Sequence, residues 1–304
     1  MDRQKVLAIV GPTGIGKTSL SVWLAKQLDG EIISCDSMQV YKKMDIGTAK
    51  VTQEEMQGIH HELIDVQNYN EPYNVKVFQE KCRTAIEDVV KRGKFPILCG
   101  GTGLYLKAAL YDYEFQEENE DIAYTAFLNS KTNEELVAML KEKDEKALEK
   151  IHPNNRKRLI RALQICRSGT SKSEQEDKQQ HIPLYDVYFL GLDVDRDILH
   201  DRINKRVDIM FENGLVKEVE DLFTNPETWE YTSFQGIGYK EFKDYFLKEK
   251  SIDEVNTAIK THSRQYAKRQ YTWFKNQMPV HWFEAQNRDE IYSAVKEWLM
   301  DEDK

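Results

Sequence analysis

The sequence predicts an α/β fold with a parallel sheet, and three observations support this. Apolar, β-branched runs alternate with amphipathic helical runs over roughly the first hundred residues, which is typical of a parallel sheet with crossover helices. Glycine-rich turns follow two of the apolar runs, at 11–16 and at 100–103. Residues 113–182 have only helical periodicity, and strand character returns after them. We therefore expect a helical module inserted into an α/β core.

The expected elements divide the chain into three segments. Early strands are expected at 5–10, 31–35 and 95–99, and early helices at 17–28 and 75–92. Later strands are expected at 185–194 and 279–283, among several helices that extend to residue 300. The segments are a first core segment, the inserted module and a second core segment with C-terminal helices, at 1–112, 113–182 and 183–304.

The first glycine-rich turn has the sequence GPTGIGKT at 11–18, between a predicted strand and a predicted helix. This is the pattern G-x-x-x-x-G-K-[ST] in its expected context. Backbone N–H groups there turn inward around an anion, the helix N-terminus adds positive potential, and Lys17 brings a charge to the outer phosphate. Thr18 is the candidate ligand for Mg²⁺. The turn predicts phosphate binding without naming the phosphate ester, and an ordinary glycine-rich turn is the alternative.

Polar side chains follow the second and third predicted strands. Asp36 and Ser37 come directly after one strand, and Thr102 follows the other. Ligands bind at the carboxyl edge of open parallel sheets, so we expect these groups to face the same ligand as the phosphate loop. Asp36 suits a general base or an indirect partner of Mg²⁺, and Gln39 and Tyr41 suit contacts with a base. The structural alternatives are an Asx-turn for Asp36 and a simple helix N-cap for Thr102.

Arg202 and Arg206 lie four residues apart on a predicted helix and therefore share one face. Mobile lids of phosphotransfer enzymes present guanidinium groups to phosphates in this way. A solvated helix face explains the two arginines equally well, so spacing alone does not decide between these interpretations.

The net charge of −9 argues against a nucleic-acid partner, but the charge is unevenly distributed. Acidic residues gather at 114–149, whereas 154–161 and 260–275 are basic. In the second basic stretch, cations and aromatic side chains interleave on adjoining helical stripes, which suits an RNA backbone and splayed bases. The alternative is a helix that buries its aromatic side chains in the core and leaves its cations in solvent.

Bulk composition excludes several other classes of protein. No apolar run approaches the roughly 20 residues of a membrane span. The four cysteines form no C-x-x-C pair, so neither a zinc knuckle nor a disulfide framework is indicated. We expect a cytoplasmic monomer without membrane contact.

An ordered set of motifs runs through these segments. In chain order they are GPTGIGKT, DSMQVY with MDIGTAK, HHELID, GGTGLY, HPNNRKRLIRAL, RINKRVDIMFENGL, QGIGYKE and RQYAKRQYTWF. The set closely resembles the bacterial tRNA dimethylallyltransferases, or IPP transferases, and it covers nearly the whole chain. The resemblance implies a P-loop, nucleotide-kinase-like parallel sheet flanked by helices, with an inserted all-helical tRNA-binding module.

The resemblance also implies a reaction. A dimethylallyl group would pass from dimethylallyl diphosphate to the N6 amine of the adenosine on the 3′ side of the anticodon. By motif, Asp36 would take the proton from that amine, and Thr102 and Arg206 would stabilise the departing diphosphate with Lys17 and a Thr18-bound Mg²⁺. The implied partners are dimethylallyl diphosphate and the tRNA anticodon stem-loop.

The implied binding residues form two sets. The diphosphate is assigned to Gly11, Thr13, Gly14, Ile15, Gly16, Lys17, Thr18 and Arg202. The tRNA is assigned to Ser37, Met38, Gln39, Tyr41, Lys157, Arg158, Arg161, Gly236, Gly238, Tyr239, Arg264, Lys268 and Arg269. The resemblance also implies a basic contact to the anticodon stem at the start of the inserted module, where this chain has the acidic segment 114–130.

Two other functions are compatible with the residues alone. A small-molecule or nucleotide kinase would have the same phosphate loop, Mg²⁺ site and arginine lid, but it gives no reason for the basic aromatic stretch at 260–275. A non-catalytic RNA-binding P-loop protein would account for that stretch, and it would have no catalytic rate to lose when Asp36 is replaced.

Overall fold

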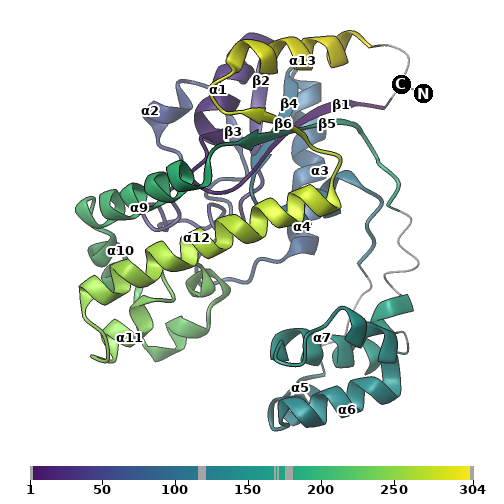
Figure 1. Cartoon of the computed structure of the whole chain (residues 1–304), viewed down its shortest axis with the longest axis vertical. Coiled ribbons are helices and arrows are strands. Elements are labelled where there is room, and N and C mark those ends of the chain that lie inside the picture. The colour runs from purple at the N-terminus through teal and green to yellow at the C-terminus, as the bar shows by residue number, and fades with distance from the viewer. Residues whose placement is uncertain (1–2, 116–120, 168, 170, 175–180, 302–304) are drawn as a thin grey trace. The chain divides into compact units, whose positions relative to one another are not determined.

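The computed structural model describes residues 3–115, 121–167, 169, 171–174 and 181–301. The chain divides into two compact units, which are coloured by residue number in Figure 1. The first unit combines Met1–Tyr111 with Pro183–Lys304 and contains the sheet. The second unit, Asp112–Ile182, has only helices among its described residues.

The elements of the first unit alternate as the sequence predicts. Its strands are β1 (Lys5–Val10), β2 (Gly30–Ser34), β3 (His61–Glu62), β4 (Phe95–Gly100), β5 (Asp186–Asp193) and β6 (His281–Glu284). Its α-helices are α1 (Lys17–Leu28), α2 (Gln53–Met56), α3 (Val75–Lys91), α4 (Gly103–Leu110), α9 (Arg196–Glu212), α10 (Leu215–Leu222), α11 (Phe242–Phe246), α12 (Ile252–Gln277) and α13 (Arg288–Met300). Two 3₁₀ helices, η2 (Pro226–Glu230) and η3 (Thr232–Gln235), lie between α10 and α11.

The six strands form one parallel sheet in the order β3-β2-β4-β1-β5-β6. The predicted α/β fold is confirmed, and each predicted strand is present within two residues of its expected ends. The edge strand β3 was not expected, because two residues are too short to show an alternating pattern. Since all neighbours are parallel, the loops after β1, β2 and β4 emerge at the same edge of the sheet.

Helices cover both faces of the sheet. Along β1, Val6, Ala8 and Val10 point into one apolar cluster, which also contains side chains of α3 and α4. Leu7 and Ile9 point into a second cluster with side chains of α1 and α13. All five side chains are fully buried, as expected for a central strand of a parallel sheet. The core therefore positions the carboxyl edge of the sheet.

The long helix α12 starts at a capping box, in which Ser251 and Glu254 exchange hydrogen bonds with each other's backbone. It packs along α9 and reaches α4, as Figure 1 shows. None of the helices in the described ranges is long and apolar enough to cross a membrane.

The second unit is a small helical bundle around its own core. Its elements are α5 (Ile122–Asn129), α6 (Asn133–Asp144), the 3₁₀ helix η1 (Glu145–Glu149) and α7 (Arg156–Arg167). Leu128, Leu136 and Leu163 are fully buried in that core. On α7, Lys157 and Arg158 are exposed, so part of the predicted basic stretch is available to a partner.

Candidate active site

The predicted phosphate loop connects β1 to α1. Gly14 and Gly16 have φ of +79° and +103°, a region that favours glycine, and Gly16 is the N-cap of α1. The Lys17 Nζ donates to the backbone oxygens of Gly11 at 2.9 Å and Pro12 at 2.8 Å. Burial lowers the pKa of Lys17 to about 8, although nearby negative groups oppose the shift. The loop thus holds its lysine against its own carbonyl groups, close to where a phosphate would bind.

Two predicted diphosphate residues of this region have different exposure. The Ile15 side chain is 1% exposed and packs in the core with α1 and α9, so only its backbone is available to an anion. Thr18 is exposed in the first turn of α1. Its hydroxyl oxygen is the kind of hard ligand that Mg²⁺ binds together with substrate phosphates and water.

Asp36 follows β2 and uses only one carboxylate oxygen for local structure. Its Oδ1 accepts from the backbone N–H groups of Met38 at 2.8 Å and Gln39 at 3.3 Å, which is an Asx-turn. Among the described residues, Oδ2 has no hydrogen-bond partner, and the side chain lines a cavity. The Asx-turn and a second role for the same carboxylate are therefore compatible.

Arg206 reaches the phosphate loop from α9. Its Nη1 donates to Thr13 Oγ1 at 3.0 Å and its Nη2 to the backbone oxygen of Ala49 at 3.4 Å. Burial lowers the pKa of Arg206, and the negative charge of Asp36 opposes the shift. Arg202 is exposed and does not line the cavity. The structure thus separates two arginines that helical spacing had grouped together.

The second glycine turn carries Thr102 at the start of α4. Thr102 is the N-cap residue, but its side chain makes no capping hydrogen bond, so the simple N-cap interpretation does not hold. Its Oγ1 instead lies 3.5 Å from Ser37 Oγ. Burial and the charge of Asp36 raise the pKa of Tyr266 to about 12, while hydrogen bonding to Thr102 opposes the shift. Thr102 and Tyr266 therefore meet beside Asp36.

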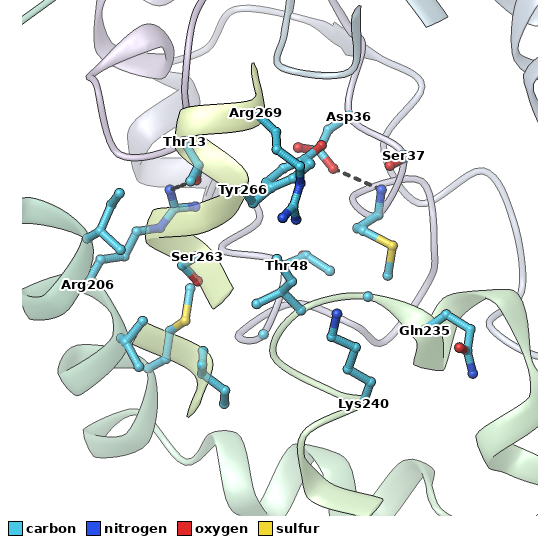
Figure 2. A pocket seen from close by; sticks show the side chains of 18 of the residues that line it. Thr13, Asp36, Ser37, Thr48, Arg206, Gln235, Lys240, Ser263, Tyr266 and Arg269 are labelled. Carbon is cyan, nitrogen blue, oxygen red and sulfur yellow. Dashed lines mark hydrogen bonds between the residues drawn. The ribbon is translucent and has the colours of Figure 1, made fainter. Parts of the chain in front are cut away.

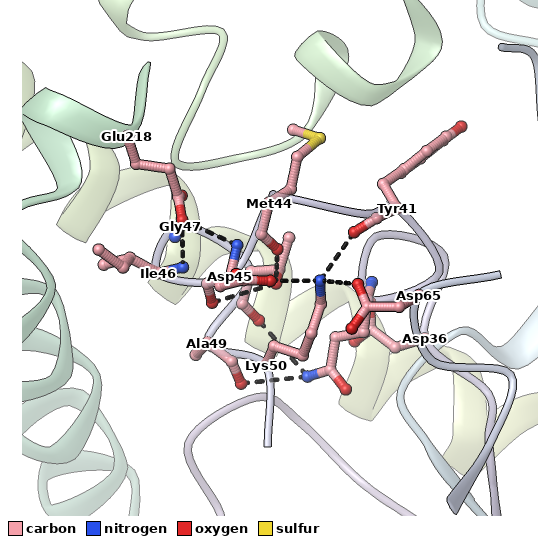
Figure 3. A network of polar contacts seen from close by, with 12 residues as sticks. Asp36, Tyr41, Met44, Asp45, Ile46, Gly47, Ala49, Lys50, Asp65 and Glu218 are labelled. Atoms are coloured by element: carbon pink, nitrogen blue, oxygen red, sulfur yellow. Dashed lines mark hydrogen bonds and ion pairs between the residues drawn. The ribbon is translucent and has the colours of Figure 1, made fainter. Parts of the chain in front are cut away.

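The loop at 36–50 is held by two charged side chains, as Figure 3 shows. The Glu218 carboxylate accepts from the backbone N–H groups of residues 45–47 at 2.7–3.0 Å. The Lys50 Nζ pairs with both Asp45 and Asp65 at 2.6 Å. Gln39 donates its side-chain amide to backbone oxygens of the same loop. No local pattern indicates the role of Glu218, because these loop residues lie more than 170 positions away from it.

These elements surround a cavity of about 350 Å³. Figure 2 shows Thr13, Asp36, Arg206, Tyr266 and Arg269 around it. One part of the lining is apolar and comes from α9 and α12, namely Ile203, Val207, Met210 and Ile259. The remaining lining residues are Ser37, Met38, Gly47, Thr48, Thr232, Gln235, Gly236, Ile237, Lys240 and Ser263. The cavity thus combines an apolar wall with cations and one carboxylate.

Two tyrosines predicted to bind tRNA, Tyr41 and Tyr239, belong to the core instead. The Tyr41 side chain is 1% exposed, and its ring meets that of Tyr73 at 6.4 Å between centroids. Tyr239 is fully buried and donates its hydroxyl to Glu218 at 2.7 Å. A base cannot stack on either ring in this structure. Tyrosine patterns alone do not distinguish a buried ring from an exposed one, which is why the sequence suggested otherwise.

The remaining predicted cations and glycines have different surroundings. Arg264 donates to side-chain oxygens of Asn204 and Thr261, so it holds α12 to α9. Lys268 and Arg269 are exposed on the same helix, and Arg161 is exposed on α7. The buried Gly238 donates its N–H to the Glu241 carboxylate at 2.9 Å and is not part of the cavity lining.

One cluster of possible metal ligands lies away from this site. Glu31, His60 and Glu62 could meet around an ion. The Arg92 Nη2, however, already lies 2.6 Å from Glu31 Oε2 and 2.8 Å from Glu62 Oε1. A guanidinium group between the two carboxylates supplies their counter-charge, so the cluster is an ion-pair network.

Known proteins match this chain along nearly its full length. A family model described as IPP transferase matches residues 39–277. A tRNA dimethylallyltransferase of Bacillus anthracis is 49% identical over 301 residues, which are 97% of this chain and 96% of that protein.

Solved structures agree with the sequence matches. The tRNA delta(2)-isopentenylpyrophosphate transferase of Staphylococcus epidermidis has a TM-score of 0.72 at 41% identity and covers 97% of this chain and 99% of its own. A eukaryotic dimethylallyltransferase acting on tRNA has a TM-score of 0.82 at 31% identity, covering 98% of this chain and 78% of its own. With the family model spanning most of the chain and relatives this similar, the chain belongs to the IPP transferase family.

Proposed function

We propose that this chain is a tRNA dimethylallyltransferase, which transfers the dimethylallyl group of dimethylallyl diphosphate to the N6 amine of the adenosine on the 3′ side of the anticodon. The observation that carries the proposal is the meeting of three groups at one cavity: Thr13 of the phosphate loop, a carboxylate with one oxygen unpaired, and the half-buried Arg206. Family membership and the names of the relatives support the same reaction.

The phosphate loop binds the diphosphate in this proposal. Backbone N–H groups of the loop and the N-terminus of α1 favour an anion, and Lys17 and Arg206 bring two cations to it. The Lys17 ammonium leaves the carbonyl groups of its own loop to meet the phosphate oxygens. Thr102 lies on the neighbouring turn and donates its hydroxyl to the oxygen that leaves carbon. These donors stabilise the charge that builds up on the diphosphate.

Asp36 acts as the general base. An exocyclic amine is a weak nucleophile because its lone pair is delocalised into the purine ring. As the nitrogen forms its bond to the allylic carbon, the carbon–oxygen bond to diphosphate breaks, and the N6 proton passes to Asp36 Oδ2. That oxygen is available because the Asx-turn uses Oδ1 alone. The products are dimethylallyl-adenosine in tRNA and diphosphate.

The apolar wall of the cavity accepts the dimethylallyl chain. Ile203 and Val207 on α9 and Ile259 on α12 line it, and apolar contact with a five-carbon chain is favourable once water leaves. An apolar wall beside the phosphate loop also keeps water away from the allylic carbon. Water that attacked this carbon would hydrolyse dimethylallyl diphosphate.

The site residues also fit Mg²⁺. This ion binds one or two protein oxygens and completes its shell with substrate phosphates and water. The exposed Thr18 hydroxyl would hold it together with the diphosphate. When bound, the ion neutralises negative charge on the leaving group.

The tRNA is expected to contact exposed cations and the cavity rim. Lys268 and Arg269 on α12, and Lys157, Arg158 and Arg161 on α7, are exposed cations, which suit the phosphate backbone. Ser37, Met38 and Gly236 line the cavity where the adenine would enter. In this proposal the protein acts as a monomer in the cytoplasm.

The test is transfer of label. The protein is incubated with Mg²⁺, labelled dimethylallyl diphosphate and an unmodified anticodon stem-loop RNA, beside a parallel assay for ATP consumption. We expect label in the RNA, and none when the target adenosine is replaced by guanosine. A protein that leaves the RNA unlabelled but consumes ATP on a nucleotide or a small alcohol is a kinase, and the proposal is then wrong.

A further inference from the structure

Gln270 of α12 lies between the two glycine turns and bonds to both. Its Oε1 accepts from the backbone N–H of Thr13 at 2.9 Å, and its Nε2 donates to the backbone oxygen of Gly101 at 2.9 Å. The side chain is only 6% exposed. One amide thus joins the phosphate loop after β1 to the turn after β4.

Each end of this bridge holds a residue of the proposed reaction. Thr13 accepts a hydrogen bond from Arg206 at 3.0 Å, so the position of Thr13 affects that of the guanidinium group. Gly101 directly precedes Thr102, whose hydroxyl lies beside Ser37. The groups proposed to meet the leaving diphosphate therefore come from two loops that one side chain joins.

The residue types at positions 101 and 270 both suit this bridge. A Cβ atom at position 101 would overlap the amide nitrogen of Gln270, so glycine is required for the close approach. One loop offers a hydrogen-bond donor, the N–H of Thr13, and the other offers an acceptor, the C=O of Gly101. A neutral primary amide supplies one acceptor and one donor at a fixed separation, which no apolar side chain can do.

We propose that Gln270 is a positioning residue, which fixes the phosphate loop against the Thr102 turn so that the groups around the diphosphate are correctly spaced. The inference rests on the proposed function. Gln270 itself need not touch the substrates. Its loss lets the two loops separate, and small misplacements in a site of this kind lower the rate steeply.

The first test replaces Gln270 by methionine, which is similar in length and volume but offers neither hydrogen bond. Gln265→Met is the matched control, because Gln265 is an exposed glutamine on the same helix. We expect kcat to fall by about 10- to 100-fold in Gln270→Met while the Kd for tRNA changes by less than about twofold. The control keeps both wild-type values.

A second readout does not depend on prenyl transfer. Binding of inorganic diphosphate is measured by calorimetry for the same proteins, and we expect a Kd about tenfold higher for Gln270→Met because the loop is no longer fixed. A folded Gln270→Met protein with wild-type kcat or wild-type diphosphate affinity overturns the inference. If the wild-type protein itself transfers no label, the proposed function fails, and the diphosphate measurement still decides whether Gln270 shapes the loop.

A third measurement separates positioning from packing and replaces the methionine variant should that protein not fold. In Gln270→Glu, an ionised carboxylate still accepts from Thr13 but repels the Gly101 oxygen, whereas a protonated carboxyl group makes both contacts. The ratio of variant to wild-type kcat is measured from pH 8.5 down to pH 6, so that groups shared by both proteins cancel. We expect the ratio to rise at least about threefold as pH falls. A ratio that stays close to one at every pH means that Gln270 only fills space, and the inference is wrong.

Discussion

Replacing Glu218 by alanine should destabilise the first unit strongly, because this one carboxylate holds four hydrogen-bond donors. It accepts from three backbone N–H groups of the loop at 45–47 and from the Tyr239 hydroxyl. The same loop supplies Gly47 and Thr48 to the cavity lining. The change therefore removes the anchor of a loop that shapes the site.

The expected loss in the free energy of unfolding depends on which hydrogen-bond donors are left without any partner, including water. Asp45 is exposed and Ile46 is half-buried, so water replaces the carboxylate at these two N–H groups. Gly47 and Tyr239 are buried, and a buried donor without a partner costs about 1–3 kcal/mol. Two such donors give an expected loss of about 2–6 kcal/mol in the free energy of unfolding.

The assay uses the location of the tryptophans. All five lie in the first unit, so urea unfolding followed by their fluorescence reports that unit and not the helical module. Glu220→Ala is the matched control, since Glu220 is exposed on the same helix. A loss below about 1 kcal/mol, or a loss equal to that of the control, would refute the reasoning.

Three further predictions concern RNA binding, pH and packing. Lys268→Ala combined with Arg269→Ala should lower the slope of log K for tRNA against log salt by about 1 to 2, and an unchanged slope means that these cations stay in solvent. Burial raises the pKa of Tyr41 to about 12 and that of Tyr239 well above its usual value. The two neutral phenols therefore contribute fully to the free energy of unfolding below about pH 10. Above that pH the free energy of unfolding falls by up to about 1.4 kcal/mol per pH unit for each such tyrosine. Urea unfolding of Tyr239→Phe at a series of pH values should show a shallower decline. Gly101→Ala should cost about 1–3 kcal/mol through overlap with the amide it faces, and a neutral result in the same assay contradicts that packing.

Much of the fold could be predicted because it depends on local patterns. Strands and helices of the core carry their own apolar periodicity, and a phosphate loop has a fixed spacing between strand and helix. The rule that ligands bind at the carboxyl edge of a parallel sheet then indicated that Asp36 and Thr102 belong near that loop. In the structure Asp36, Ser37 and Tyr266 line the same cavity, and the Thr102 hydroxyl lies 3.5 Å from that of Ser37.

What could not be predicted depends on contacts between distant segments. Gln270 meets Thr13 across 257 positions, and Glu218 meets Gly47 across 171. Neither side chain differs in the sequence from an ordinary polar residue of a helix. Helical spacing likewise gave Arg202 and Arg206 the same face, and only the packing of α9 against the phosphate loop distinguishes them.

The most direct test of the account is the single-turnover rate of Asp36→Asn with saturating tRNA and dimethylallyl diphosphate. Asparagine keeps an oxygen for the N–H groups of Met38 and Gln39, so the turn survives while the base is lost. We expect the rate of prenyl transfer to fall by about 10²- to 10⁴-fold, with the Kd for tRNA close to that of the wild type. A variant that transfers the prenyl group at the wild-type rate would show that Asp36 does not take the proton.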